Sequence, residues 1–214
     1  MRNYSEKLIR LTNFIRLTAL VLLNKLIRNT KRYIMKDTGF KFSPKEDAGA
    51  VSVDAIRICR PDSKNGAAVH DFIAGCHPLD ANSMYCNLLQ CTHFSETCAM
   101  AEIDGKLYGF VSGYLHPDDP SVLFIWQVAV HEDVRGLGLG KEMLSAILRR
   151  TVCDGVEKIQ TTITRDNKAS WALFKSLARD LGAGCQDEVL FDRGEHFHGR
   201  HASEYLLTIG PIRK

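Results

Sequence analysis

Three absences narrow what this 214-residue chain can be. Its seven cysteines are odd in number and include no Cys-x-x-Cys pair, so buried, reduced thiols are the favoured interpretation and predict a cytoplasmic protein. No uninterrupted apolar run reaches the roughly 20 residues that a membrane span needs, which argues against stable membrane insertion. No internal repeat or low-complexity tract is present. A single globular domain with a real core remains.

The larger part of the chain also lacks an excess of positive charge. Residues 51–214 hold 17 Lys and Arg against 21 Asp and Glu, whereas residues 1–50 hold 11 against 4. A nucleic-acid surface needs a basic patch, so we expect no nucleic-acid partner. A mildly acidic body suits a cationic small molecule instead.

Residues 1–50 differ from the rest, and we expect the folded domain to occupy residues 51–214. Residues 7–28 read as a basic, apolar-rich, amphipathic helix, and a polar linker follows. Three interpretations stay open: a mitochondrial transit peptide, a helix at a membrane surface, or an extension upstream of a true start at Met35. The first would make the location mitochondrial.

Two clusters contain potential metal ligands, but neither predicts a metal site. One comprises Cys86, Cys91, His93 and Cys98, and the other His196, His198 and His201. The spacing of the first matches no zinc pattern. For the histidine run, a position lining a substrate pocket or the surface is favoured over metal binding.

The most informative motif is glycine-rich and reads Arg-Gly-Leu-Gly-Leu-Gly at 135–140. It follows the apolar run 123–130 and precedes residues 141–150, which have helical periodicity. Free backbone N–H groups and a positive dipole end at a helix start favour an anion, and glycines allow phosphate oxygens to approach closely. The residues expected to form this phosphate site are Arg135, Gly136, Leu137, Gly138, Leu139, Gly140 and Lys141.

Other glycine motifs fit this loop less well. A dinucleotide fingerprint needs Gly-x-Gly-x-x-Gly near the start of a domain, and here the glycines alternate late in the chain. A Walker A loop needs a hydroxyl after Gly-Lys, but Glu142 follows Lys141. An ordinary helix-capping turn is the remaining alternative. The spacing Arg-x-x-Gly-x-Gly resembles the acyl-CoA pyrophosphate loop of the GCN5-related N-acetyltransferase (GNAT) superfamily.

The order of expected elements points the same way. Strands are expected at 56–59, 97–102, 106–114, 121–130, 156–163, 186–191 and 204–209, and helices at 63–75, 82–94, 141–150 and 167–181. This order resembles a GNAT domain. The resemblance implies an α/β (α+β) fold with a mixed, mostly antiparallel sheet of six to seven strands and about four helices.

A second segment, 164–174, resembles the GNAT region that packs on the pantetheine and thiol end of acetyl-CoA. The resemblance implies contacts of acetyl-CoA with Asn167, Ser170 and Phe174, and with strand residues Gln127, Val128 and Val130, and it implies no metal. Many family members carry a tyrosine at the position of Phe174, where it acts as the general acid. A phenyl ring has no proton to give, so the acid in this chain is left open.

A more specific resemblance covers nearly all of residues 56–212. The segments 78–94, 113–120, 123–130 and 196–211 resemble those of the L-2,4-diaminobutyrate acetyltransferases of ectoine biosynthesis, a GNAT family. The resemblance implies that an acetyl group moves from acetyl-CoA to the γ-amine of L-2,4-diaminobutyrate by direct attack on the thioester. It also implies a homodimer.

The attacking amine is mostly protonated at neutral pH, so the site must attract a cation and then accept its proton. We expect Asp80, Glu204 and Trp126 to be catalytic, the carboxylates handling the proton and the indole offering a cation–π face. The expected substrate contacts are Asp80, Asn82, Tyr85, Trp126, His196 and Glu204. Arg193 and Arg200 are candidates for the substrate carboxylate.

Plainer roles exist for several of these residues. Asp80 fits a helix N-terminus, Glu204 a solvated strand, and Trp126 and Tyr85 a core. Two rival functions stay open beside the favoured one: a GNAT enzyme for another small amine, and a non-catalytic acyl-CoA-binding domain prompted by Phe174.

Overall fold

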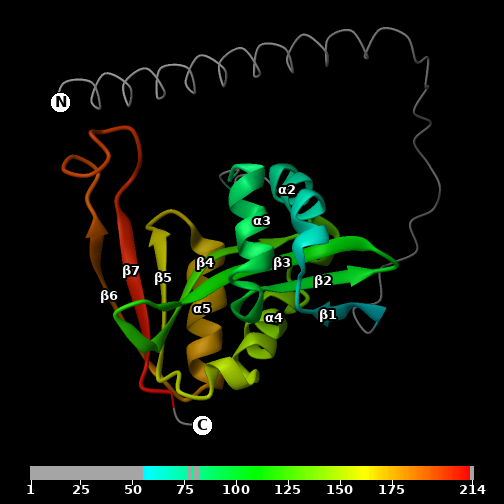
Figure 1. The fold of residues 1–214 in the computed structure, drawn as a ribbon. Helices are drawn as coiled ribbons and strands as arrows, with labels where there is room; N and C mark the ends of the chain where they lie inside the picture. Colours follow the sequence, from blue (N-terminus) through cyan, green and yellow to red (C-terminus); the bar gives the residue numbers. More distant parts are fainter. Residues whose placement is uncertain (1–54, 77–78, 80–81, 213–214) are drawn as a thin grey trace, which may run out of the picture. The chain divides into compact units, whose positions relative to one another are not determined.

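The computed structural model describes residues 55–76, 79 and 82–212 (Figure 1). The chain divides into two units, residues 1–48 and 49–214, and the described elements all belong to the second. The interpretations of residues 1–50 as a presequence or an interfacial helix therefore lie outside the described residues and stay predictions.

A seven-stranded mixed sheet forms the centre of the domain. Its strands are β1 (Arg57–Cys59), β2 (Ala99–Ile103), β3 (Lys106–His116), β4 (Asp119–Val130), β5 (Lys158–Thr164), β6 (Gly184–Phe191) and β7 (Glu204–Gly210). They lie in the order β1-β2-β3-β4-β5-β7-β6. Among the described strands only β4 and β5 pair in parallel. The predicted sheet is confirmed.

Two helices cover each face of this sheet (Figure 1). Helices α2 (Gly66–Gly75) and α3 (Met84–Thr92) bury Val69, Ile73 and Cys91 on one face, whereas α4 (Leu139–Leu148) and α5 (Lys168–Asp180) contribute to a larger core on the other. Alternate residues of β3 serve the two cores, Phe110 the smaller and Val111 the larger, as strand geometry requires.

Most expected boundaries hold to within two residues, and the differences have local causes. The expected helix 63–75 starts as a 3-10 turn, Ser63–Asn65, because the Asp62 side chain caps it by accepting a hydrogen bond from the Lys64 N–H. Helix α4 begins two residues before the expected start, since Gly138 turns the chain with a φ of 87° and the helix begins at once.

One extra residue in β4 separates this strand from β5. Ser112 of β3 pairs with Gln127, but the next residue, Gly113, pairs with Ile125, so Trp126 forms a bulge. A Cβ on Gly113 would lie 2.7 Å from the Phe124 carbonyl oxygen, which explains the glycine. The parallel pairing with β5 ends at Ile125 and Thr161. Beyond that point β4 and β5 part.

The seven cysteines are free thiols, as expected, but not all are buried: Cys59 and Cys86 are partly exposed and Cys185 is exposed. Burial raises the pKa of Cys91 to about 11 and that of Cys98 to about 12, so both stay protonated and unreactive at neutral pH. Within the described part of the chain, no helix is long and apolar enough to cross a membrane.

Candidate active site

A cavity of about 730 Å³ opens where β4 parts from β5. Its walls come from four segments: the end of the α2–α3 connection at Asn82, the bulged part of β4, the turn from β5 into α5, and the start of β7 with the residues before it. Polar and aromatic side chains thus converge on one opening of the sheet, which is the usual setting for a ligand site.

The loop Arg135–Gly140 does not line this cavity, but it lies beside it, since a Cβ on Gly140 would be 3.5 Å from Val128 Cγ1 in the lining. We call this loop and the turn from β5 into α5 the donor side of the site. Gly136 and Gly138 have φ values of 78° and 87°, and a Cβ on either would meet no atom within 4 Å. The glycines are therefore required by backbone conformation, and the space above them is open. The first N–H groups of α4 have no acceptor within the helix, so this loop suits a phosphate.

The turn from β5 into α5 completes the donor side. The side chain of Asn167 caps α5 by accepting a hydrogen bond from the Ser170 N–H at 3.1 Å. Thr164 Oγ1 donates to Asp166 Oδ1 at 2.6 Å, and this bond lowers the pKa of the Asp166 carboxyl. Phe174 lines the cavity from α5 and is only 2% exposed.

Arg165 connects this turn to β6 and β7 at one end of the sheet. Its guanidinium lies 3.7 Å from the ring centroid of Tyr205 in β7 and 5.3 Å from that of Trp171 in α5. It also pairs with Asp187 of β6 at 2.6 Å. A planar guanidinium suits such stacking, and it links the donor side to the strand that carries Glu204.

Four further residues of the lining, Asn82, Trp126, His201 and Glu204, make up what we call the acceptor side. The bulge leaves the Trp126 indole 48% exposed rather than packed in the core. Glu204 begins β7, and its Oε1 lies 3.9 Å from His201 Nδ1. The His201 Nδ1 is also 2.7 Å from the Ala202 carbonyl oxygen. A carbonyl only accepts, so Nδ1 carries a proton and Nε2 of the neutral ring has the lone pair.

A self-contained loop between β6 and β7 presents His201. The N–H groups of Glu195 and Gly194 donate to the Asp192 carboxylate and hold its pKa below the usual range. Ser203 Oγ donates to the same carboxylate. The Phe197 ring lies 4.8 Å from the His201 ring, centroid to centroid. These contacts fix the loop around one aspartate.

The structure brings together most, but not all, of the residues expected in the site. Asn82, Trp126, Gln127, Val128, Asn167, Ser170, Phe174 and Glu204 line one cavity. Asp80 lies outside the described residues. Tyr85 is 70% exposed on α3, and His196 accepts a hydrogen bond from the Asp192 N–H; neither lines the cavity, and neither does Val130. The ammonium of Lys141 pairs with Asp180 of α5 at 2.6 Å.

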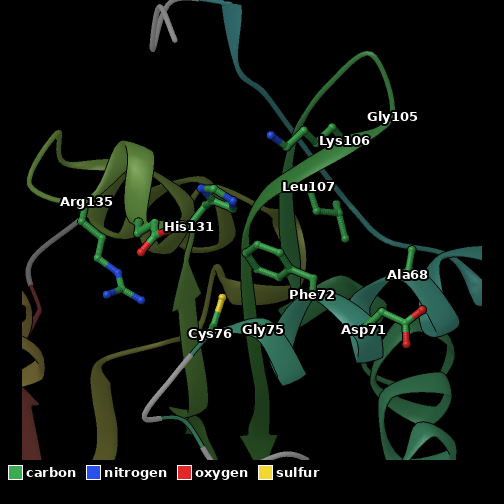
Figure 2. A pocket seen from close by; sticks show the side chains of 11 residues that line it. Ala68, Asp71, Phe72, Gly75, Cys76, Gly105, Lys106, Leu107, His131 and Arg135 are labelled. Atoms are coloured by element: carbon green, nitrogen blue, oxygen red, sulfur yellow. The ribbon is translucent and has the colours of Figure 1, made fainter. Parts of the chain in front are cut away.

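Arg135 lies on the wall of a second hollow, of about 600 Å³, beside α2 and the β2–β3 turn (Figure 2). Phe72 and Leu107 form its apolar part. Its rim carries both signs of charge, with Lys106 and Arg135 against Asp71 and Glu132. The Nε of Arg135 donates to the Val130 carbonyl at 3.1 Å, which ties the start of the glycine loop to the end of β4. Because the rim carries both signs of charge, it favours neither an anionic nor a cationic ligand.

Sequence reasoning gave His201 no role in catalysis. Its position three residues before Glu204, at the end of the histidine run, is the sequence feature that could have indicated a shared role for the two side chains. Within the described residues, no group of three or more His, Cys, Asp or Glu side chains is arranged to hold a metal.

Comparison with known proteins places this chain in a family. The model of the acetyltransferase (GNAT) family matches residues 67–178. The L-2,4-diaminobutyric acid acetyltransferase from Methylotuvimicrobium alcaliphilum is 51% identical to this chain, in a match that covers 74% of this chain and 92% of the relative. The one from Vibrio cholerae is 47% identical, in a match that covers 70% of this chain and 87% of the relative. Diaminobutyrate acetyltransferase EctA from Paenibacillus lautus, solved with L-2,4-diaminobutyric acid and coenzyme A, is 34% identical with a TM-score of 0.71. That match covers 74% of this chain and 96% of the EctA chain.

Proposed function

Because the chain belongs to the L-2,4-diaminobutyric acid acetyltransferases of the GNAT superfamily, we propose that it acetylates the γ-amine of L-2,4-diaminobutyrate with acetyl-CoA. The products are Nγ-acetyl-L-2,4-diaminobutyrate and CoA, and the reaction is a step of ectoine biosynthesis. The observation that carries this proposal is one cavity, at the point where β4 and β5 part, that is lined both by the turn into α5 and by an acidic and aromatic acceptor side. The glycine loop adjoins this cavity, because a Cβ on Gly140 would lie 3.5 Å from Val128 Cγ1 in its lining.

The acceptor side suits a cation. The γ-ammonium has a pKa near the lysine reference of about 10.4 and therefore arrives protonated. The Glu204 carboxylate supplies a negative charge and the exposed Trp126 indole a cation–π face. Asp80, two residues before Asn82, is proposed as the second carboxylate from its place in the sequence.

The same side offers an acceptor for the proton. The Nδ1 of His201 points at the Ala202 carbonyl, which leaves the Nε2 lone pair for a proton from the substrate, directly or through one water. The nearby Glu204 stabilises the imidazolium that results. In the proposed reaction the ammonium loses this proton, its nitrogen forms a bond to the thioester carbon and gives up a second proton to solvent, and the carbon–sulfur bond breaks.

The donor side holds the thioester in place. The pairing of β4 with β5 ends at Ile125 and Thr161, and we propose that backbone groups of β4 beyond this point, such as those of Trp126 and Val128, contact pantetheine and the developing oxyanion. Phe174 cannot protonate the departing thiolate. We propose that water or the imidazolium of His201 supplies that proton.

Mass spectrometry of the products tests the function. The purified protein is incubated with acetyl-CoA and, separately, L-2,4-diaminobutyrate, lysine and spermidine, while free thiol is measured. We expect γ-acetylated diaminobutyrate and thiol release well above that with the other amines. Equal rates on all three amines would favour a GNAT enzyme for another amine. Binding of acetyl-CoA without thiol release would favour the non-catalytic alternative that Phe174 suggests.

We propose further that the enzyme is a homodimer, with β6 in the interface. All eight residues of this edge strand are exposed, and Val189, Leu190 and Phe191 are 49%, 37% and 42% exposed. An open edge with apolar side chains is a place where chains pair. Light scattering should give twice the chain mass, and Val189→Lys should give the monomer. A monomeric unaltered protein would contradict this assembly.

A further inference from the structure

One hydrogen bond joins the acceptor side of the cavity to β4. The Asn82 Nδ2 donates to the Gln127 Oε1 at 3.0 Å. Both side chains are half-buried, and both line the cavity. No general feature of the fold requires an amide pair here, because two apolar side chains of similar size would fill the same space.

The two partners belong to elements with different tasks. Asn82 immediately precedes Ser83, whose Oγ caps α3 by accepting a hydrogen bond from the Cys86 N–H at 3.2 Å. Asn82 is therefore attached to a fixed helix start. Gln127 directly follows the bulged Trp126, at the point where β4 has left β5. The bond thus connects the start of α3 to β4, the strand proposed to hold the thioester.

The surroundings of Gln127 on the sheet are polar as well. Its cross-strand partner Ser112 is fully buried, and within the described residues the Ser112 Oγ has no hydrogen-bond partner. An unsatisfied buried hydroxyl costs about 1–3 kcal/mol, so packing alone does not account for polar side chains at this spot. A role in the site accounts for them better than a role in stability.

We infer that Gln127 is a positioning residue, which acts through Asn82 to hold the start of α3 at a fixed distance from β4, the strand proposed to hold the thioester. This inference rests on the proposed acetyl transfer. The reacting nitrogen and carbon must lie in a narrow range of geometry, and a displacement of about 1 Å can cost on the order of 10²-fold in rate. Loss of the amide pair should therefore affect the use of diaminobutyrate and leave acetyl-CoA binding unchanged.

A double-mutant cycle tests this. Gln127→Leu and Asn82→Leu, singly and together, are compared for kcat, for KM of L-2,4-diaminobutyrate, for the Kd of acetyl-CoA and for Tm. We expect each single change to lower kcat/KM for diaminobutyrate about tenfold, within the range for misplaced reactants. The double change should be no worse than either single one, because partners in one contact are not additive. Gln127→Glu keeps the acceptor oxygen and should retain most of the activity.

Gln160→Leu provides a matched control. The Gln160 Nε2 donates to Thr208 Oγ1 at 3.1 Å between β5 and β7, and Gln160 does not line the cavity, so its removal should leave both kinetic constants unchanged. The inference is overturned if the two leucine changes act additively, if they weaken acetyl-CoA binding as much as catalysis, or if they leave diaminobutyrate turnover intact. Absence of turnover in the unaltered protein would instead overturn the proposed function, and this inference with it.

Discussion

The donor and acceptor sides of the site are built in different ways. The donor side relies on backbone: two glycines with positive φ, the start of α4, and the part of β4 beyond its pairing with β5. The acceptor side relies on side chains from distant parts of the chain, Asn82, Trp126, His201 and Glu204. A backbone site recognises what all acyl-CoA molecules share, whereas the side chains decide which amine is accepted. Changes on the two sides should therefore have separable effects.

We expect Glu204→Gln to show the largest difference between its effect on diaminobutyrate turnover and its effect on acetyl-CoA binding. The change keeps the shape but removes the charge that attracts the ammonium and stabilises His201. Turnover of diaminobutyrate should fall by about 10²–10⁴-fold, the usual contribution of an acid–base group. The Kd of acetyl-CoA, measured by calorimetry, should not change. Glu157→Gln, at an exposed position before β5, is the control; equal losses in the two variants would remove Glu204 from the mechanism.

Gly138→Ala should have the opposite effect, weakening acetyl-CoA binding and leaving the use of diaminobutyrate unchanged. A Cβ meets no neighbour there, but a φ of 87° strains an L-residue by about 1–2 kcal/mol, so acetyl-CoA should bind about 5- to 30-fold more weakly. The Kd for acetyl-CoA measures this effect, and the KM for diaminobutyrate should remain the same. Gly155→Ala has equal space without a positive φ and serves as the control. Unchanged binding in Gly138→Ala would show that the loop does not hold the phosphates.

Trp126→Leu should raise the KM for diaminobutyrate by about 2- to 30-fold, the range for a cation–π contact. Trp126→Phe keeps an aromatic face and should lose less. Steady-state kinetics with both substrates varied gives the result. If leucine and phenylalanine are equivalent, the ring does not contact the ammonium.

The smallest effect is expected at Asp192, which acts only through the loop that presents His201. Its folded pKa is lowered, so its stabilisation is present above the unfolded value of about 3.9 and is lost as the pH falls through the folded pKa. Asp192→Ala should raise the KM for diaminobutyrate severalfold at most, near neutral pH. Protection of residues 192–203 from hydrogen exchange, measured against the intrinsic rate at the same pH, should be lower in this variant and, in the unaltered protein, under acid. Asp154→Ala is the exposed control, and no difference between the two would contradict a fixed loop.

How much the sequence predicted also differs between the two sides. The glycine motif, the strand before it and the helix after it predicted the donor side, because local backbone chemistry defines it. Trp126 and Glu204 are 78 residues apart, and only the family resemblance suggested that they meet. The bulge that exposes Trp126 follows from pairing between β3 and β4, which no local pattern encodes.

Two residues show the limit of local reasoning most clearly. Lys141 is predicted to contact phosphate from its place in the motif, which stays a prediction; the motif gives no sign that its ammonium also pairs with Asp180, which the next helix supplies. His201 looked like one of three equivalent histidines, and only the return of the chain in β7 distinguishes it by placing Glu204 beside it. The first contact joins two helices, whereas the second joins residues only three apart, and only the folded cavity shows that His201 and Glu204 both line it.

The open edge at β6 has a practical consequence. Cys185 is the one cysteine classed as exposed among the seven, and it lies near the start of this strand, whereas the others are wholly or partly covered. A thiol-reactive spin label or fluorophore added in substoichiometric amount should therefore react mainly there. Since β6 is also the strand proposed for the dimer interface, pairing of two chains should shield this thiol, so slower labelling of the unaltered protein than of Val189→Lys would report the assembly directly.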